Sequence, residues 1–318
     1  MENKKTILVT GGAGFIGSAL TKRLVGEGHD VVVVDNFNEY YDVSLKRARQ
    51  KEFLAGALVL EGDITDSVFL SELFTHYQFD VVCHLAAQAG VRYSVENPEA
   101  YVHTNIHGLQ ILLETMRTFA VTQMVFASSS SVFGNDSQAP FLESYSADKP
   151  VSMYAATKRA GELIAHSYAS MYKMNITCLR FFTVYGPWSR PDMAMITFAR
   201  KIIADEEVDI YNNGNLRRDF TYIDDIVDGF VLAVMKPLGY EILNLGNNSP
   251  VELLKYVAIL EQKLGKEAKK NLLPMQLGDV YETYADITKA KTLLGFEPKI
   301  SIEEGIGKFV QWYRGFYT

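Results

Sequence analysis

The chain begins with a glycine-rich turn, TGGAGFIG at residues 10–17, placed between two segments of different periodicity. The β-branched run Thr6–Thr10 before the turn is typical of a strand, and apolar residues at helical spacing follow it. Gly11, Gly14 and Gly17 permit the tight turn and close backbone approach that place a pyrophosphate on a helix N-terminus. Glycines at this spacing also occur in ordinary structural turns, so the residues around them decide between the two interpretations.

Asp35 favours the cofactor interpretation, because it ends the next expected strand, Val31–Val34. A carboxylate there accepts a hydrogen bond from a ribose 2′-hydroxyl and repels a 2′-phosphate. The turn and Asp35 therefore predict a bound dinucleotide and favour NAD over NADP. Further residues of the turn and of later strand ends are assigned to the same cofactor site: Phe15, Ile16, Asp63, Ile64, Leu85, Ala86 and Ala87. Ordinary strand-end turn chemistry explains the pair at 63–64 and the run at 85–87 about equally well.

Strand-like and helix-like segments alternate through the first half of the chain. The expected strands are continuous apolar runs, which indicate a parallel sheet covered on both faces. The expected strands are Thr6–Thr10, Val31–Val34, Ala57–Leu60, Asp80–Leu85, Val121–Ala127 and Ile176–Phe182, and the expected helices are Gly14–Gly26, Asp66–Tyr77, Asn97–Phe119 and Val151–Tyr172. The predicted fold class is α/β, a doubly wound, Rossmann-type parallel sheet whose ligands lie beyond the carboxyl ends of the strands.

The alternation changes after about residue 183, where a loop rich in Pro and Arg (TVYGPWSRPDM) begins. Shorter strands and polar turns follow the loop, with helices near 224–235, 249–264 and 286–294. We therefore assign residues 1–183 to an NAD-binding Rossmann domain, with return segments near 220–248. Residues 184–318 are assigned mainly to a smaller C-terminal lobe that binds substrate.

Tyr154 and Lys158 form a YxxxK pattern on the expected helix Val151–Tyr172. Their spacing puts both side chains on one helix face. A phenol with an ordinary pKa near ~10 is a poor base at neutral pH, but a neighbouring ammonium and a positive nicotinamide ring favour the phenolate. The cluster Ser128–Ser131 directly follows a strand, where an open sheet presents hydroxyls to substrate. These groups beside NAD can take a proton from an alcohol while its carbon loses hydride, although a plain Tyr–Lys surface pair is the structural alternative.

Several segments together resemble the extended short-chain dehydrogenase/reductase family over essentially the whole chain. The segments are TGGAGFIG, Asp35, HLAAQ, the serine cluster before Val132, and YAATK. The resemblance implies that Tyr154 is the base, that Lys158 tunes it, and that Ser129 hydrogen-bonds the reacting hydroxyl. Phe133 replaces the tyrosine usual in the family's SSxxVYG pattern, which is not a catalytic position. The resemblance also implies a homodimer formed through the two longest expected helices, whose apolar faces could instead simply pack on the sheet.

Longer segments narrow the resemblance to the UDP-glucuronate 4-epimerases. The segments are DNFNEYYDVSLKRAR, HLAAQAGVRYSVENP, SMYAATKRAGELIAHSY, RFFTVYGPWSRPDM and RRDFTYIDDI. Such enzymes oxidise C4 to a ketone with tightly held NAD and return hydride to the other face, which here implies UDP-galacturonate as product. The related decarboxylases carry a Glu where this chain has Ser131, and UDP-galactose 4-epimerases usually carry an Asn where it has Thr183. The alternatives are a UDP-glucuronate decarboxylase, another UDP-hexose 4-epimerase, or a catalytically silent dinucleotide-binding sensor.

The sugar of the UDP-sugar substrate is assigned to six side chains: Ser129, Ser130, Ser131, Tyr154, Thr183 and Arg190. We expect Arg190 to hold the carboxylate, because an arginine can grip a carboxylate bidentately and fix its plane. A loop arginine that only pairs with Asp192 is the alternative. By resemblance, Arg218 is expected at the UDP diphosphate, and Arg92 and Asp279 along the nucleotide. A solvated arginine pair and a structural turn are the alternatives for residues 218 and 279.

Composition and charge exclude other classes of partner. The 318 residues carry 31 Lys and Arg against 38 Asp and Glu, and the formal charge of −7 argues against nucleic acid as the main partner. No apolar stretch approaches the ~18 residues of a membrane helix. Cys83 and Cys178 form no disulfide framework, so we expect a soluble cytoplasmic protein without a membrane partner. His103 and His107 are spaced for a metal ion but have no third ligand, so no metal is expected.

Overall fold

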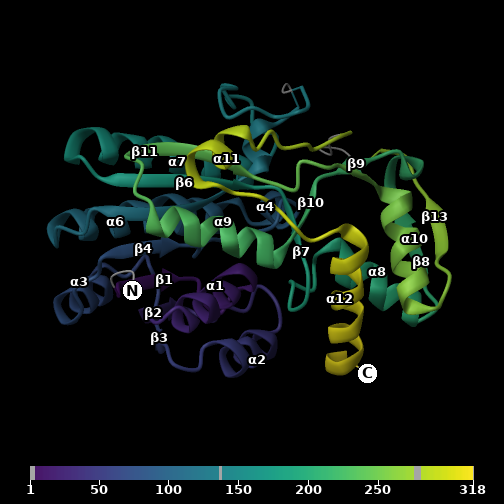
Figure 1. Cartoon of the computed structure of the whole chain (residues 1–318), viewed down its shortest axis with the longest axis horizontal. Helices are drawn as coiled ribbons and strands as arrows, with labels where there is room; N and C mark the ends of the chain where they lie inside the picture. Colours follow the sequence, from purple (N-terminus) through teal and green to yellow (C-terminus); the bar gives the residue numbers. More distant parts are fainter. Residues whose placement is uncertain (1–3, 136–137, 276–280, 318) are drawn as a thin grey trace.

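A seven-stranded parallel sheet forms the centre of the computed structural model, which describes residues 4–135, 138–275 and 281–317 (Figure 1). Its strands are β1 (Thr6–Thr10), β2 (Asp30–Asp35), β3 (Leu58–Glu61), β4 (Val81–His84), β5 (Gln123–Ser129), β6 (Asn175–Phe181) and β11 (Tyr240–Leu245). They lie in the order β11-β6-β5-β4-β1-β2-β3, and each neighbouring pair is parallel. The order reverses between β1 and β4, which is where doubly wound sheets open a ligand crevice. The predicted fold class is therefore confirmed.

Helices cover both faces of the sheet, because its strands are apolar on both sides. In β2, Val31 and Val33 belong to one apolar core, and Val32 and Val34 belong to the other. The helices on the first side are α1 (Phe15–Gly26), α2 (Val43–Phe53), α9 (Ile223–Met235) and α11 (Thr288–Leu294). The helices on the second side are α3 (Ser67–His76), α6 (Leu109–Thr118) and α7 (Met153–Tyr172).

The predicted long helix over Asn97–Phe119 is present from Pro98 to Thr118, but its middle part is π-helical, which the sequence did not indicate. After the short helix α4 (Tyr93–Glu96), the segment divides into α5 (Pro98–Tyr101), a π-helical stretch η1 (Val102–Gly108) and α6. Asn105 of η1 is buried, and its side chain accepts from the Gln88 amide (2.7 Å) and donates to the Gln88 carbonyl (3.0 Å). π-Turns are frequent at functional sites, and this one fixes the loop that follows β4.

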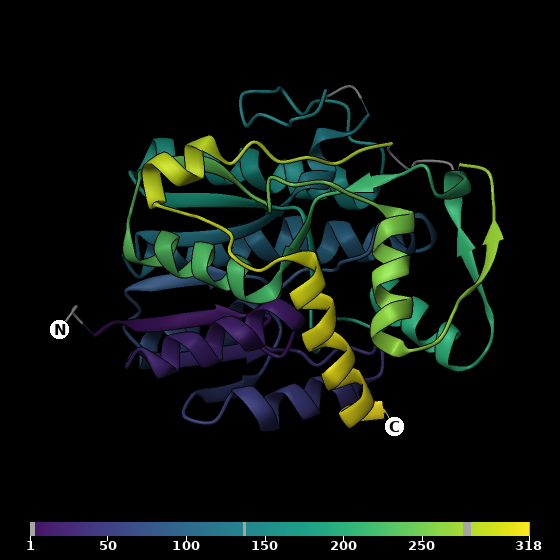
Figure 2. The same cartoon turned by 45° about the vertical axis from the view of Figure 1, so that its right-hand side comes forward.

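Smaller elements of the C-terminal half stand beyond the carboxyl ends of the central strands. The paired strands there are β7 (Thr183–Tyr185) with β10 (Phe220–Tyr222), β8 (Glu207–Ile210) with β13 (Lys269–Leu272), and β9 (Arg217–Arg218) with β12 (Val251–Glu252). The helices there are α8 (Ala194–Ile203), α10 (Leu253–Leu264) and α12 (Ile302–Tyr317). Figures 1 and 2 show β8, β13 and α10 at the end of the molecule toward which the central strands point. Strand β11 returns from this half to pair with β6, and the domain division at residue 183 stays a prediction.

Candidate active site

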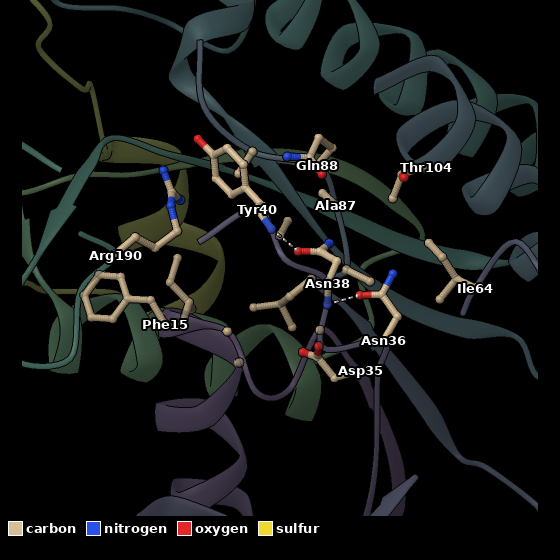
Figure 3. Close-up of a pocket in the computed structure, with 18 of the residues that line it drawn as sticks. Phe15, Asp35, Asn36, Asn38, Tyr40, Ile64, Ala87, Gln88, Thr104 and Arg190 are labelled. Carbon is tan, nitrogen blue, oxygen red and sulfur yellow. Dashed lines mark hydrogen bonds between the residues drawn. The ribbon is translucent and has the colours of Figure 1, made fainter. Parts of the chain in front are cut away.

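A pocket opens at the carboxyl ends of the central strands (Figure 3). Every residue that the sequence assigned to the cofactor lies on its wall: Gly11, Gly14, Phe15, Ile16, Gly17, Asp35, Asp63, Ile64, Leu85, Ala86, Ala87, Tyr154 and Lys158. The wall also includes Ser128 and Arg190, which come from the serine cluster and from the loop after β7. Residues predicted to bind the cofactor and residues predicted to act on the substrate, although they come from separate parts of the chain, therefore line one pocket.

The glycine turn is packed so closely that side chains would not fit in it. Gly11 has φ +72°, and its amide donates to the Val34 carbonyl at 2.7 Å. A Cβ atom on Gly11 would lie 2.6 Å from the Ala86 nitrogen, and one on Gly17 would lie 2.3 Å from the Gly11 carbonyl oxygen. The start of α1 therefore borders the pocket as bare backbone, which fits the pyrophosphate of a dinucleotide.

Asp35 joins the glycine turn to the segment after β2. Its Oδ2 accepts from the Ala13 amide and its Oδ1 from the Phe37 amide, both at 2.9 Å. Each carboxylate oxygen can accept a second hydrogen bond, and Asp35 lies on the pocket wall. The carboxylate can therefore hold the turn and bind a ribose hydroxyl at the same time.

In the Asp35→Asn variant, the ratio of the affinities for NAD and NADP is expected to fall about tenfold, which corresponds to ~1.4 kcal/mol. The amide removes the negative charge that repels a 2′-phosphate, and its NH2 group cannot accept from a backbone amide as the lost oxygen does. Calorimetric titration with both cofactors measures the ratio. Glu61→Gln is the matched control, because Glu61 ends the neighbouring strand β3 but is exposed and pairs with Arg47. An unchanged ratio in Asp35→Asn would remove this carboxylate from cofactor discrimination.

The segment after β2 forms a side of the pocket to which the sequence assigned no role. Asn36, Asn38, Tyr40 and Lys46 all lie on the wall, and Figure 3 shows the first three in a row with Asp35. The Lys46 ammonium donates to the backbone and side-chain oxygens of Asn38 at 2.7 and 2.8 Å. Asn38 Oδ1 also accepts from the Tyr40 amide at 3.3 Å. The available signal was DNFNEYYD, a polar run directly after a strand end.

Tyr154 and Lys158 lie in the first turns of α7, and Ser129 ends β5. Ser152 caps α7 by accepting from a backbone amide of the first turn at 3.1 Å, which fixes where the helix begins. The buried Lys158 ammonium donates to the Ala127 carbonyl of β5 at 2.8 Å. The Ser129 side chain lowers the pKa of Tyr154, so its hydroxyl lies near the phenol. The three predicted catalytic residues are thus brought together by one helix–strand contact.

Burial is the largest influence on the titration of these groups. It raises the pKa of Tyr154, against the opposite effects of the Ser129 side chain and the Arg190 charge. It lowers the pKa of Lys158 to about 8, against the opposite effect of Glu162. In the structure, Ser129 and Arg190 lower the pKa of Tyr154 and the Lys158 ammonium donates to a backbone carbonyl, so the expected effect of Lys158 on the phenol stays a prediction.

A buried ion pair lies next to the contact between α7 and β5, and it was not predicted from the sequence. Glu162, one turn after Lys158, accepts from Arg180 Nε and Nη2 at 2.8 Å each and from Ser128 Oγ at 2.6 Å. The Arg180 and Glu162 side chains are 1% and 0% exposed. Burying such a pair costs as much solvation as it gains in attraction, so its benefit is geometric. We infer that it fixes α7 against β5 and β6 and keeps the tyrosine aligned with the serine cluster.

Fewer of the residues expected around the sugar lie on the pocket wall than of those expected around the cofactor. Arg190 lies on the pocket wall, and its Nε and Nη2 donate to Asp192 Oδ1 and Oδ2 at 3.0 Å each. The pairing named as the alternative is therefore present. Ser130 and Ser131 form the short 3₁₀ turn η2 (Ser130–Phe133), and Thr183 begins β7. Over the described residues, the wall of this pocket does not include Thr183 or the serines Ser129, Ser130 and Ser131, although it includes Ser128.

The arginines expected at the nucleotide both contact the C-terminal half. The Arg92 guanidinium lies 5.6 Å from the centre of the Tyr211 ring, in the turn η3 (Tyr211–Gly214). Arg218 Nη1, on β9, donates to the Tyr281 carbonyl at 3.1 Å. Asp279 lies outside the described residues. Both arginines are thus held in the region predicted to bind substrate.

No metal site was found within residues 4–135, 138–275 and 281–317, where no group of three or more His, Cys, Asp or Glu side chains could hold an ion. His103 and His107 stand with ring centres 5.8 Å apart on η1. In that same described part of the chain, no helix has both the length and the apolar character needed to cross a membrane.

Fold and pocket together define a dinucleotide-dependent enzyme of the doubly wound α/β class, for which the sequence predicts a Ser-Tyr-Lys catalytic set. The matching family model covers residues 7–246, which include the glycine turn, Asp35, Ser129, Tyr154 and Lys158. The chain belongs to the NAD-dependent epimerase/dehydratase family.

Known proteins resemble the chain along nearly its whole length. UDP-glucuronate 4-epimerase 1 of Arabidopsis thaliana is 48% identical over 331 residues, covering 98% of this chain and 77% of the plant protein. The UDP-glucuronic acid 4-epimerase of Bacillus cereus, solved with UDP-glucuronic acid and NAD, has a TM-score of 0.92 at 36% identity, covering 98% of this chain and 100% of that chain. The UDP-glucose 4-epimerase of Thermotoga maritima, solved with UDP-glucose, has a TM-score of 0.90 at 32% identity and the same coverages. Enzymes named for two different sugars share the fold, so side chains must decide the substrate.

Proposed function

We propose that the protein epimerises C4 of UDP-glucuronate to give UDP-galacturonate, through a transient 4-keto intermediate and with tightly bound NAD. Similarity to UDP-glucuronate 4-epimerases over nearly the whole chain supports this function. The observation that carries it is Arg190 on the wall of the pocket that also holds Tyr154 and Lys158. A guanidinium beside the reacting hydroxyl suits a sugar with a carboxylate at C6.

The residues of the pocket have distinct tasks in this reaction. Bound NAD would supply the hydride acceptor for C4 of the sugar and the donor for its return to the opposite face. Tyr154 takes the proton of the C4 hydroxyl and gives it back after the ketosugar has rotated. Ser129, which ends β5 near Tyr154, is assigned the same substrate oxygen, although the pocket wall itself includes only its neighbour Ser128. Lys158 supplies a buried positive charge near the phenolate that forms, and its contact with β5 keeps that charge in place.

A uronate makes an additional demand, because its 4-ketone is β to the C6 carboxylate. In such a β-keto acid the C5–C6 bond can break, its electron pair passing into the enolate of the ketone as CO2 leaves. Arg190, with Thr183 and the hydroxyl of Ser130 or Ser131, is proposed to hold the carboxylate near the plane of the carbonyl, where the orbital overlap for this loss is poor. Ser131 also stands where the decarboxylases carry a glutamate.

The UDP half of the substrate is proposed to extend from this pocket toward the C-terminal half. Arg218 is proposed at the diphosphate, and Arg92 and Asp279 along the nucleotide. The contacts of the two arginines with Tyr281 and Tyr211 support this placement.

Product analysis by NMR tests the proposal. Purified protein is incubated with UDP-glucuronate, with and without added NAD, and UDP-galacturonate is the expected product. Turnover of UDP-glucose without turnover of UDP-glucuronate would favour the hexose epimerase that the Thermotoga structure also suits. A UDP-pentose or a stable NADH signal would indicate a decarboxylase or a net dehydrogenase. Bound NAD with no conversion of any UDP-sugar would indicate a sensor.

The proposed assembly is a homodimer formed through α7 and the η1–α6 segment. These elements pack against each other, and large apolar side chains on them are exposed. The side chains are Val102 (39%), Leu163 (55%), Met171 (60%) and Tyr172 (44%). Residues 163 and 171 are two helical turns apart on α7, so a second copy could cover them together.

Leu163→Glu is expected to weaken this dimer by at least about tenfold, because an unpaired carboxylate in a buried interface costs far more than a lost apolar contact. Light scattering over a concentration series measures the mass. Val68→Glu is the control, since Val68 is 66% exposed on α3, a helix that is not among the proposed interface elements. A monomeric parent chain, or a dimer that tolerates Leu163→Glu as well as Val68→Glu, contradicts the proposal.

We also propose a cytoplasmic location and retain the domain division at residue 183. The free, buried thiols of Cys83 and Cys178 suit a reducing compartment. The return of β11 to the central sheet supports a division in which part of the C-terminal half belongs to the Rossmann domain.

A further inference from the structure

Arg190, on the pocket wall, forms a two-point ion pair with Asp192. Arg190 Nε donates to Asp192 Oδ1 and Nη2 donates to Oδ2, both at 3.0 Å. This geometry uses one edge of the planar guanidinium and two of its five N–H groups. The other edge, formed by Nη1 and the second hydrogen of Nη2, can take another carboxylate bidentately. Pairing with Asp192 and binding a substrate carboxylate are therefore compatible.

Asp192 has a second partner that comes from a distant part of the chain. The Tyr40 hydroxyl donates to Asp192 Oδ2 at 3.1 Å, although the two residues are 152 positions apart. Tyr40 belongs to the segment after β2, and Figure 3 shows it on the same side of the pocket as Arg190. A Cβ atom on Gly90 would lie 2.2 Å from the Tyr40 hydroxyl oxygen, so the ring is also packed against the loop after β4.

We propose that Asp192 is a positioning residue that orients the second edge of the Arg190 guanidinium toward the carboxylate of the sugar. Tyr40 in turn holds Asp192 in place and connects it to the segment after β2, which lines the cofactor site. The proposal rests on the proposed function and specifies how that site selects a uronate. Without Asp192, the arginine keeps its charge but loses the two contacts that fix its plane. The carboxylate would then still be attracted, but its orientation relative to the ketone would no longer be set.

The Arg190–Asp192 pair is partly solvated, because its side chains are 25% and 38% exposed. A partly exposed pair contributes less to folding stability than a fully buried one, so removing the Asp192 charge is expected to lower the thermal midpoint only modestly. Selectivity and product distribution are the quantities expected to change.

The test uses NAD-loaded enzyme and two variants, Asp192→Asn and Tyr40→Phe. Calorimetry measures the affinities for UDP-glucuronate and UDP-glucose, and NMR measures the UDP-pentose formed per UDP-galacturonate. Asp192→Asn is expected to lower the preference for UDP-glucuronate about tenfold, the effect of one lost charged hydrogen bond, and to raise the UDP-pentose fraction. Tyr40→Phe is expected to change both in the same direction by a smaller factor, and it remains informative if the Asp192 variant folds poorly.

Asp205→Asn is the matched control, because Asp205 forms an exposed pair with Lys269 outside the pocket wall. A parent protein that binds both sugars equally overturns the proposal whatever its activity. If the parent epimerises UDP-glucuronate but Asp192→Asn keeps its preference and products, the positioning role is wrong while the proposed function stands. A parent that prefers UDP-glucuronate but does not epimerise it contradicts the proposed function alone.

Discussion

Tyr154→Phe is expected to reduce the turnover of UDP-glucuronate by about 10³-fold, within the range that a positioned proton-transfer group contributes. The substitution removes one hydroxyl and keeps the ring, so the pocket wall retains its shape. Burial raises the pKa of Tyr154, which keeps the hydroxyl protonated at neutral pH in the free protein. Proton transfer therefore depends on the Ser129 side chain, on the charges of Arg190 and Lys158 and on the bound cofactor.

The experiment compares kcat by NMR with the NAD released from denatured protein. Tyr168→Phe is the control, since Tyr168 lies on the same helix but its hydroxyl donates to Glu114 at 3.2 Å, outside the pocket wall. Tyr154→Phe should retain NAD, and Tyr168→Phe should retain both NAD and activity. Turnover within tenfold of the parent in Tyr154→Phe would assign the proton transfer to another group.

The cofactor half of the site could be predicted because its signals are local. The glycine turn, the strand before it and the carboxylate at the end of β2 lie within the first 35 residues. Because ligands bind at the carboxyl ends of parallel strands, residues at the ends of later strands could be assigned to the same site. The contact between Gly11 and Ala86 shows this convergence directly.

The missed features depend on contacts between distant positions. Glu162 meets Arg180 and Ser128 across 18 and 34 positions, and nothing near Glu162 in the sequence indicates that it is buried. Helix α2 escaped prediction because its buried residues include Lys46 and Arg49, so its apolar periodicity is weak. Arg49 is held by the Trp188 carbonyl across 139 positions, a contact that only the folded chain creates.

The π-helical stretch within the long helix has a similar cause. Its residues have good helical spacing, and no proline or glycine marks the place where η1 begins at Val102. The π-helical stretch is favoured by the buried side chain of Asn105, which bonds the Gln88 backbone and also donates to Thr157 Oγ1 at 3.0 Å. Such tertiary hydrogen bonds override the local preference for a regular helix.

Arg190→Ala is expected to lower kcat/KM for UDP-glucuronate by about 10²-fold, as the loss of a bidentate charged contact implies. The change for UDP-glucose should be much smaller, because that sugar has no carboxylate at C6. The remaining turnover of UDP-glucuronate should release more CO2, since the C5–C6 bond of the 4-keto intermediate is no longer held near the plane of the ketone. Rates on both sugars and trapped CO2 measure the three effects.

Arg190→Lys separates charge from geometry in this prediction. A lysine restores a positive charge but cannot bind a carboxylate in a plane, so affinity should partly recover while the excess CO2 persists. Arg200→Ala is the control, because Arg200 forms an exposed pair with Glu206 on α8, outside the pocket wall. Equal losses on both sugars with no additional CO2 would show that Arg190 shapes the pocket without holding a carboxylate. The uronate specificity would then have to come from Thr183 and the serines of η2, which are the other proposed partners of the carboxylate.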